Sequence, residues 1–202
     1  MALGEWIETV FAFLGAPGLL AAMFLIFLAD AAVFPALPEV FIVAFYFQLT
    51  LGSGWAPLAA SATLLALALA GDVCGNAGLF ALVRSLRARG HVPRRLERVM
   101  QRYVRALLVK DERVLLVNRI APAVPLTGAF IAVCGWNPRR SLAYVFAGGL
   151  AKYALLLALA AWLGVVLDPG LAQNATFAAV GAFVAASFAA GHLRRRKLEA
   201  DP

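Results

Sequence analysis

The sequence FPALPEVFI at residues 34–42 interrupts an apolar run that extends over residues 31–51. Pro35 and Pro38 each remove a backbone donor, and Glu39 adds a carboxylate, so the run does not suit a straight helix that faces lipid. Broken backbone persists at membrane depth only where protein or a water-filled cavity satisfies its polar groups. We therefore expect residues 31–51 to form a re-entrant hairpin, which enters the membrane and returns to the same side.

A second run of the same kind covers residues 114–136 and contains APAVPLTGAFI at residues 121–131. The two runs share a Pro-Ala-aliphatic-Pro core, in which Pro122 and Pro125 correspond to the first pair of prolines. We interpret all four prolines as shaping the backbone. Chance matches also occur in chains rich in Ala and Pro, but here each run is followed by a polar turn and a spanning helix.

The composition places the whole chain in a membrane. Hydrophobic residues make up 63% of it and charged residues 14%, whereas a soluble domain carries about 25% charged residues. The mean hydropathy is +0.84. We predict an all-α polytopic membrane protein with about four spanning helices. The expected spans are residues 10–29, 58–83, 141–167 and 172–193.

The predicted span at residues 58–83 contains the glycine-rich stretch GDVCGNAG at residues 71–78, which we expect to interrupt it. Gly71 and Gly75 lie four residues apart, a spacing that allows another helix to approach closely.

The basic residues fall into clusters between the apolar runs. The net charge is +7, and ten Lys or Arg residues lie between residues 84 and 113, with further clusters at 139–140 and 194–197. Cytoplasmic loops carry an excess of Lys and Arg. All clusters reach one side only if the two hairpins enter from opposite faces, as in inverted-repeat transporters. If both runs spanned fully, one cluster would lie outside.

We therefore predict a single membrane domain over residues 1–202, with repeat 1 at about 30–83 and repeat 2 at about 114–167. The expected location is the cell membrane, inner or plasma, with the basic loop and the C-terminus in the cytoplasm. Apolar residues recur at helical spacing within residues 84–113. This pattern predicts an amphipathic helix that lies on the membrane surface or packs on the bundle. A recognisable nucleic-acid-binding module is missing, so we expect no nucleic acid partner.

These motifs resemble the DedA family, within the wider group of VTT or SNARE-associated membrane proteins. The resemblance covers roughly residues 29–164 and rests on FPALPE, on GDVCGNAGLFALVR at residues 71–84 and on NRIAPAVP at residues 118–125, in that order. It implies two opposed re-entrant hairpins and a flippase or transporter for a phospholipid or polyprenyl phosphate, with proton coupling. The family's acidic positions match Asp30 and Glu39, and its arginine matches Arg119.

The chain departs from the family pattern at several positions. The family often has a second arginine where this chain has Pro125, and Val83-Arg84 replaces the usual Gly-Arg. The spacing from proline to Glu39 is one residue shorter. These departures leave the substrate and the coupling open, and the related small multidrug export proteins are an alternative.

Ionisable groups within a membrane are costly and indicate function. Five lie in or beside the apolar runs: Asp30, Glu39, Asp72, Arg119 and Lys152.

A carboxylate removed from water can hold a proton near neutral pH, so we assign proton coupling to Glu39, Asp30 and Asp72. Arg119 and Lys152, with the adjacent Asn118, are assigned to the anionic headgroup.

Each assignment has a structural alternative. Glu39 suits the first turn of a helix, where a carboxylate is favoured. Asp30 suits the membrane interface. Arg119 could pair with Glu39 or Asp72, and Lys152 could pair with Asp72 or extend to the interface.

The sequence has no nucleophile elbow, metal-ligand cluster or glycine-rich phosphate loop. We expect no enzyme activity, no metal and no cofactor. The expected partners are a membrane lipid and protons or another coupling ion, and a homo-oligomer is compatible with the sequence. A small-molecule or ion transporter is the second hypothesis, and a non-transporting scaffold or lipid-phosphate hydrolase is the third.

Overall fold

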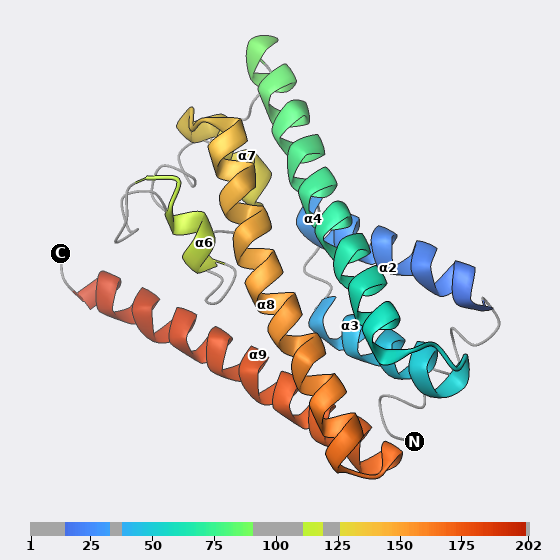
Figure 1. Ribbon diagram of the computed structural model, residues 1–202. Coiled ribbons are helices and arrows are strands. Elements are labelled where there is room, and N and C mark those ends of the chain that lie inside the picture. The colour runs from blue at the N-terminus through green and yellow to red at the C-terminus, as the bar shows by residue number, and fades with distance from the viewer. Residues whose placement is uncertain (1–14, 33–37, 91–110, 119–125, 201–202) are drawn as a thin grey trace.

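The computed structural model describes residues 15–32, 38–90, 111–118 and 126–200, and this part of the chain is helical without strands. The predicted all-α class is therefore confirmed. Figure 1 shows α4 and α8 side by side and antiparallel through the centre of the molecule. In this view α2 and α3 lie to the right of α8, α6 lies to its left, and α7 lies behind the upper part of α8, next to α4. The elements are α2 (Gly15–Ala32), α3 (Pro38–Phe47), the π-helical turn η2 (Gln48–Gly52), α4 (Pro57–Ala88), α6 (Val114–Asn118), α7 (Thr127–Cys134), α8 (Pro138–Val166) and α9 (Pro169–Ala200).

Three of the described helices, α2, α4 and α8, are long and apolar enough to cross a membrane. In the most apolar stretch of each of these helices, only 22% to 39% of the residues are buried within the protein. Large apolar side chains are exposed on all three helices, among them Leu25 on α2, Leu58 on α4 and Leu155 on α8, as expected of helices that face lipid. The predicted first span extends five residues before α2, and residues 10–14 lie outside the described part. The predicted last span lies within the 32 residues of α9.

The predicted interruption of the second span is wrong, because α4 is one continuous helix over its 32 residues. Its glycines serve close packing, as expected. A Cβ added at Gly71 would lie 2.6 Å from the carbonyl oxygen of Phe24, and one at Gly75 would lie 2.5 Å from that of Leu28. The backbones of α2 and α4 are therefore in direct contact, and only glycine permits this distance.

Two short helices occupy the interior. α3 and η2 have 10 and 5 residues and together reach about 22 Å at a rise of about 1.5 Å per residue, less than a bilayer core of about 30 Å. α7 has 8 residues. Helices α2, α4, α8 and α9 contact α3, while α2, α4 and α8 contact α7. Most residues of both short helices are buried.

Neither proline-containing run forms a single through-going helix in the described residues. Pro38 is the first residue of α3, a position where the missing N–H costs nothing. Pro35, Pro122 and Pro125 lie outside the described residues. The hairpin predicted within residues 31–51 differs from the structure, because residues 38–52 form a single helical segment and residues 31–32 belong to α2.

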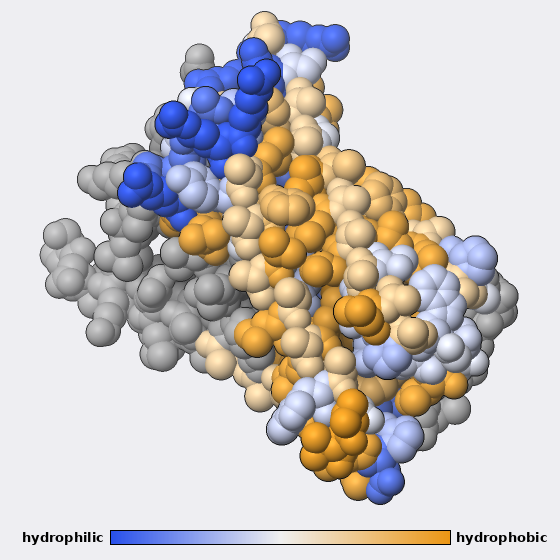
Figure 2. Space-filling model, viewed as in Figure 1, coloured by the Kyte–Doolittle hydropathy of each residue, from blue (hydrophilic) through white to orange (hydrophobic). Residues whose placement is uncertain are grey.

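The exposed basic residues of α4 and α8 lie at one end of the bundle. α4 ends with Arg84 and Arg87 exposed, and α8 begins with Arg139 and Arg140 exposed. Figure 2 shows this end as a hydrophilic cap on an otherwise largely apolar face. Residues 84–88 of the predicted amphipathic segment belong to α4, and residues 91–110 lie outside the described part.

The polar residues 137–140, which we expected to form the turn after the second apolar run, supply the N-cap and the first three residues of α8. The Asn137 side chain accepts hydrogen bonds from the backbone N–H groups of Arg139 and Arg140 at 3.0 and 3.3 Å. Asparagine is among the preferred N-cap residues for this reason.

The close contact of α2 and α4 predicts opposite effects for two neighbouring substitutions. Gly75→Ala should lower the stability by about 1–3 kcal/mol, because its Cβ would clash with backbone. Gly78→Ala is the matched control: its Cβ meets no atom within 4 Å, and alanine gains up to about 1 kcal/mol of helix propensity. Thermal unfolding of the purified proteins in one detergent measures both. Equal shifts would contradict the proposed packing.

A buried ion pair as the candidate functional site

Glu39 lies in the first turn of α3, the position that the structural alternative assigned to it. The positive end of a helix dipole favours a carboxylate there. Only 7% of the residue is exposed. The carboxylate is thus held inside the protein at the buried end of a short helix.

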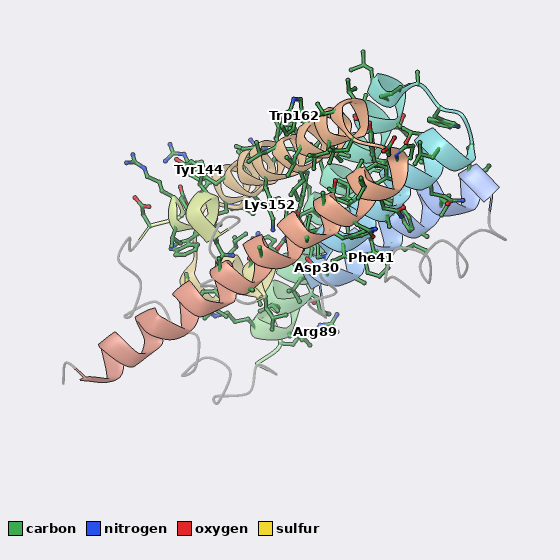
Figure 3. The ribbon with its side chains drawn as sticks, turned by 90° about the horizontal axis from the view of Figure 1, so that it is seen from below. Asp30, Phe41, Arg89, Tyr144, Lys152 and Trp162 are labelled. Carbon is green, nitrogen blue, oxygen red and sulfur yellow. The ribbon has the colours of Figure 1, made fainter. Side chains whose placement is uncertain are left out.

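Lys152 supplies the counter-charge from the middle of α8. Its Nζ donates a hydrogen bond to Oε1 of Glu39 and forms an ion pair with it. The two side chains are 13% and 9% exposed. Figure 3 shows Lys152 and Asp30 toward the middle of the view, while Trp162 lies at its outer edge. The sequence suggested Asp72 or the interface for Lys152, and the structure adds Glu39 as a partner that it did not suggest.

An aromatic ring lies beside the cation. The ammonium of Lys152 lies 5.7 Å from the ring centroid of Tyr153, within the range of a cation–π contact. Tyr153 is 1% exposed, and its ring packs edge-on against that of Phe27 at 5.0 Å. The charged pair therefore lies against an apolar wall, and water is largely excluded from it.

Asp72 and Asn76 form a buried polar pair on α4. They are 2% and 0% exposed, and Nδ2 of Asn76 donates to both the carbonyl oxygen and Oδ1 of Asp72 at 2.9 Å. Oδ2 of Asp72 lies 3.4 Å from the position of a Cβ on Gly149. The second carboxylate therefore meets α8 at Gly149, about one helical turn before Lys152.

A third polar contact lies between α6 and α7. Nδ2 of the buried Asn118 is 3.4 Å from Oγ1 of the buried Thr127. The next residue, Gly128, packs so closely on α4 that an added Cβ would lie 2.2 Å from the carbonyl oxygen of Asn76. Buried polar groups therefore follow one another from α6 and α7, across the middle of α4, to α8 and α3.

The remaining predicted site residues are less central. Asp30 is half-buried, two residues before the end of α2, near a helix end as expected. Arg119 lies outside the described residues. Within the described part, no three His, Cys, Asp or Glu side chains gather where they could hold a metal ion.

Sequence reasoning missed three buried residues of this region: Asn76, Thr127 and Tyr153. Asn76 had a usable signal, because it follows Asp72 by four residues and so shares its helix face. Thr127 and Tyr153 are ordinary residues of apolar helices, and only the packing shows their position.

Comparisons of the chain with protein-family models, with curated proteins and with solved structures found no match. The likeness to the DedA family therefore rests on the short motifs and their order. The function must be argued from the geometry of this site.

The ion pair predicts a non-additive effect on stability. Lys152→Met leaves the Glu39 carboxylate buried without its counter-charge and should cost about 3 kcal/mol or more, as for other broken buried pairs. The double variant Lys152→Met/Glu39→Gln removes both charges and should recover most of this loss. Unfolding in detergent of the wild type, the single variants and the double variant measures the coupling between the two side chains. Strictly additive losses of stability would show that they do not interact.

Proposed function

We propose that this chain is a membrane transporter that moves an anionic phospholipid or polyprenyl phosphate across the bilayer, as the DedA resemblance implies. The observation that carries the proposal is the buried Glu39–Lys152 pair within an apolar helical protein. A buried ion pair adds little stability compared with apolar residues of the same size. Charges inside a membrane protein therefore favour a role in a substrate or ion pathway.

The headgroup site is assigned to Lys152, Asn118 and Arg119. An ammonium is a point charge that binds phosphate oxygens, and the buried amide of Asn118 offers N–H donors. Arg119 follows Asn118 directly in the chain, and its guanidinium would add a forked donor. Glu39, Asp72 and Asp30 supply carboxylates that take up the coupling protons.

The two short helices support a pair of opposed hairpins. Each short helix begins at a buried residue, which is Pro38 in α3 and Thr127 in α7. Each segment then ends at an exposed residue, which is Gly52 after α3 and Gly135 after α7. This is the course of an arm that returns from the membrane interior to a surface. We propose α2 with α3 as the first hairpin and α6 with α7 as the second.

The exposed ends of the two segments lie at opposite ends of α4. Gly52 is separated from the first residue of α4 by only a short turn. At the other end, Nη1 of Arg87, from the last turn of α4, donates to the carbonyl oxygens of Ala132 and Val133 at 3.2 and 3.1 Å. If α4 spans the bilayer, the hairpins open to opposite faces, as in an inverted repeat.

This topology predicts which positions a membrane-impermeant thiol reagent reaches. In a chain whose own Cys74 and Cys134 are replaced by alanine, Gly54→Cys should react in intact cells. Arg139→Cys should react only after the cells are opened, because its end of the bundle carries the basic residues. Reaction of both positions in intact cells would exclude the proposed orientation.

Transport itself predicts a requirement for the buried cation. In proteoliposomes that contain a fluorescent anionic phospholipid, the wild type should move the lipid between leaflets. Lys152→Met should slow this by tenfold or more, because a lost hydrogen bond to a charged group costs about 1.5–3 kcal/mol. Arg139→Gln, which removes an exposed cation of the same helix, should stay within about twofold of the wild type.

Two other results of this transport experiment would be informative. Wild-type rates no faster than those of protein-free vesicles would refute lipid transport. Accumulation of a cationic dye, without lipid movement, would assign the scaffold to the small-molecule transporters instead.

A further inference from the structure

We infer that Lys152 alternates between two anions, the Glu39 carboxylate in the empty protein and a substrate anion in the loaded one, so that each bound anion brings one proton onto Glu39. This inference rests on the proposed function and specifies how its site is coupled. It assigns an order of events to residues that the structure places in direct contact.

The geometry limits what Lys152 can bind at one time. Its ammonium already donates to Oε1 of Glu39, it is almost buried, and one side of it faces the ring of Tyr153. An incoming anion would therefore compete with the carboxylate, and two anions on one cation would leave an excess negative charge in an apolar interior. Such a charge is strongly disfavoured.

Protonation of Glu39 removes this conflict. The carboxylate oxygen gains a proton from water on the side of entry and becomes neutral. The ammonium keeps its own three protons and redirects its hydrogen bond to an oxygen of the anion. When the anion leaves, Glu39 releases the proton and the ion pair forms again, so one proton accompanies one negative charge.

Transfer of a proton alone or of an anion alone is disfavoured for the same reason. A proton alone would neutralise Glu39 and leave the ammonium without its carboxylate. An anion alone would bring a second negative charge to Lys152. Only the empty ion pair and the doubly loaded state balance the charge of these two residues, and the intermediate states are disfavoured by the low dielectric of the site.

Other titratable groups lie on the elements packed against α3. They include Asp30 on α2, Asp72 and Cys74 on α4, and Tyr144 and Tyr153 on α8, together with the exposed arginines at one end of α4 and α8, while the described side chains of α9 include none. Asp72 is engaged by Nδ2 of Asn76. Glu39 is the carboxylate whose hydrogen bond to Lys152 is defined, so the proton is assigned to Glu39.

The test measures proton uptake on binding, separately from transport. The purified full chain in weakly buffered detergent is titrated with dihexanoyl phosphatidylglycerol, whose phosphodiester does not itself titrate near neutral pH. A pH indicator and calorimetry report protons and bound lipid. The wild type should take up about one proton per lipid, and its Kd should rise about tenfold per pH unit where the ion pair is formed.

Three variants locate the proton. Glu39→Gln should bind the lipid without proton uptake and with little pH dependence, because Lys152 no longer has a competing carboxylate. Lys152→Arg, which retains the cation, should retain the uptake. Asp168→Asn is the matched control, a carboxylate-to-amide change at an exposed position of the α8–α9 turn, and it should behave as the wild type. Folding of each variant is verified by its circular dichroism and elution volume.

The outcomes separate this inference from the proposed function. Lipid binding by the wild type without proton uptake, or uptake that survives Glu39→Gln and disappears in Asp72→Asn, would overturn the inference and leave transport intact. Coupled uptake without lipid movement in vesicles would overturn the transport proposal and leave the coupling intact. Absence of any lipid binding by the wild type would overturn both.

Discussion

Close backbone contact around the middle of α4 is the constraint on which the interior depends. α2 meets α4 at Gly71 and Gly75, α7 meets it through Gly128, and α8 meets it through Gly149. Because a glycine lies at each of these contacts, three helices approach one short stretch of α4. Without a hydrophobic force between helices in lipid, such packing is a principal source of association.

This packing also explains why polar groups can lie in the interior. Asp72 and Asn76 occupy the stretch of α4 that the three helices enclose, and they hydrogen-bond each other there. The same contacts bring α8 to the short helix α3, so that Lys152 reaches Glu39 across the bundle. A site for charge in a membrane needs such an enclosure, because lipid cannot solvate an ammonium or a carboxylate.

The apolar exterior and the charged interior are the two features on which the proposed transport rests. Most of the surface of α2, α4 and α8 is apolar and suits lipid chains. The buried ion pair, in contrast, adds little stability compared with apolar side chains of the same size. The short helices α3 and α7 supply buried helix ends on which such a site can be built.

Sequence patterns predicted much of the fold and part of the site. Apolar runs and their lengths indicated the membrane class and the long apolar helices now seen as α2, α4 and α8, and the spacing of Gly71 and Gly75 indicated a close helix contact. The sequence also singled out Glu39, Asp72 and Lys152, because a charge in an apolar run stands out. It predicted a hairpin within residues 31–51, whereas residues 38–52 form one helical segment, because a proline indicates where a helix breaks and not how far its neighbours continue.

The sequence by itself determined which residues had to be enclosed, since hydropathy and charge belong to the residues and are independent of the fold. Only the tertiary structure decided which of them meet. Glu39 and Lys152 are 113 residues apart, and no local pattern relates them. Their contact follows from the angle and depth at which α3 enters between α2, α4, α8 and α9, and side-chain packing across several helices sets both.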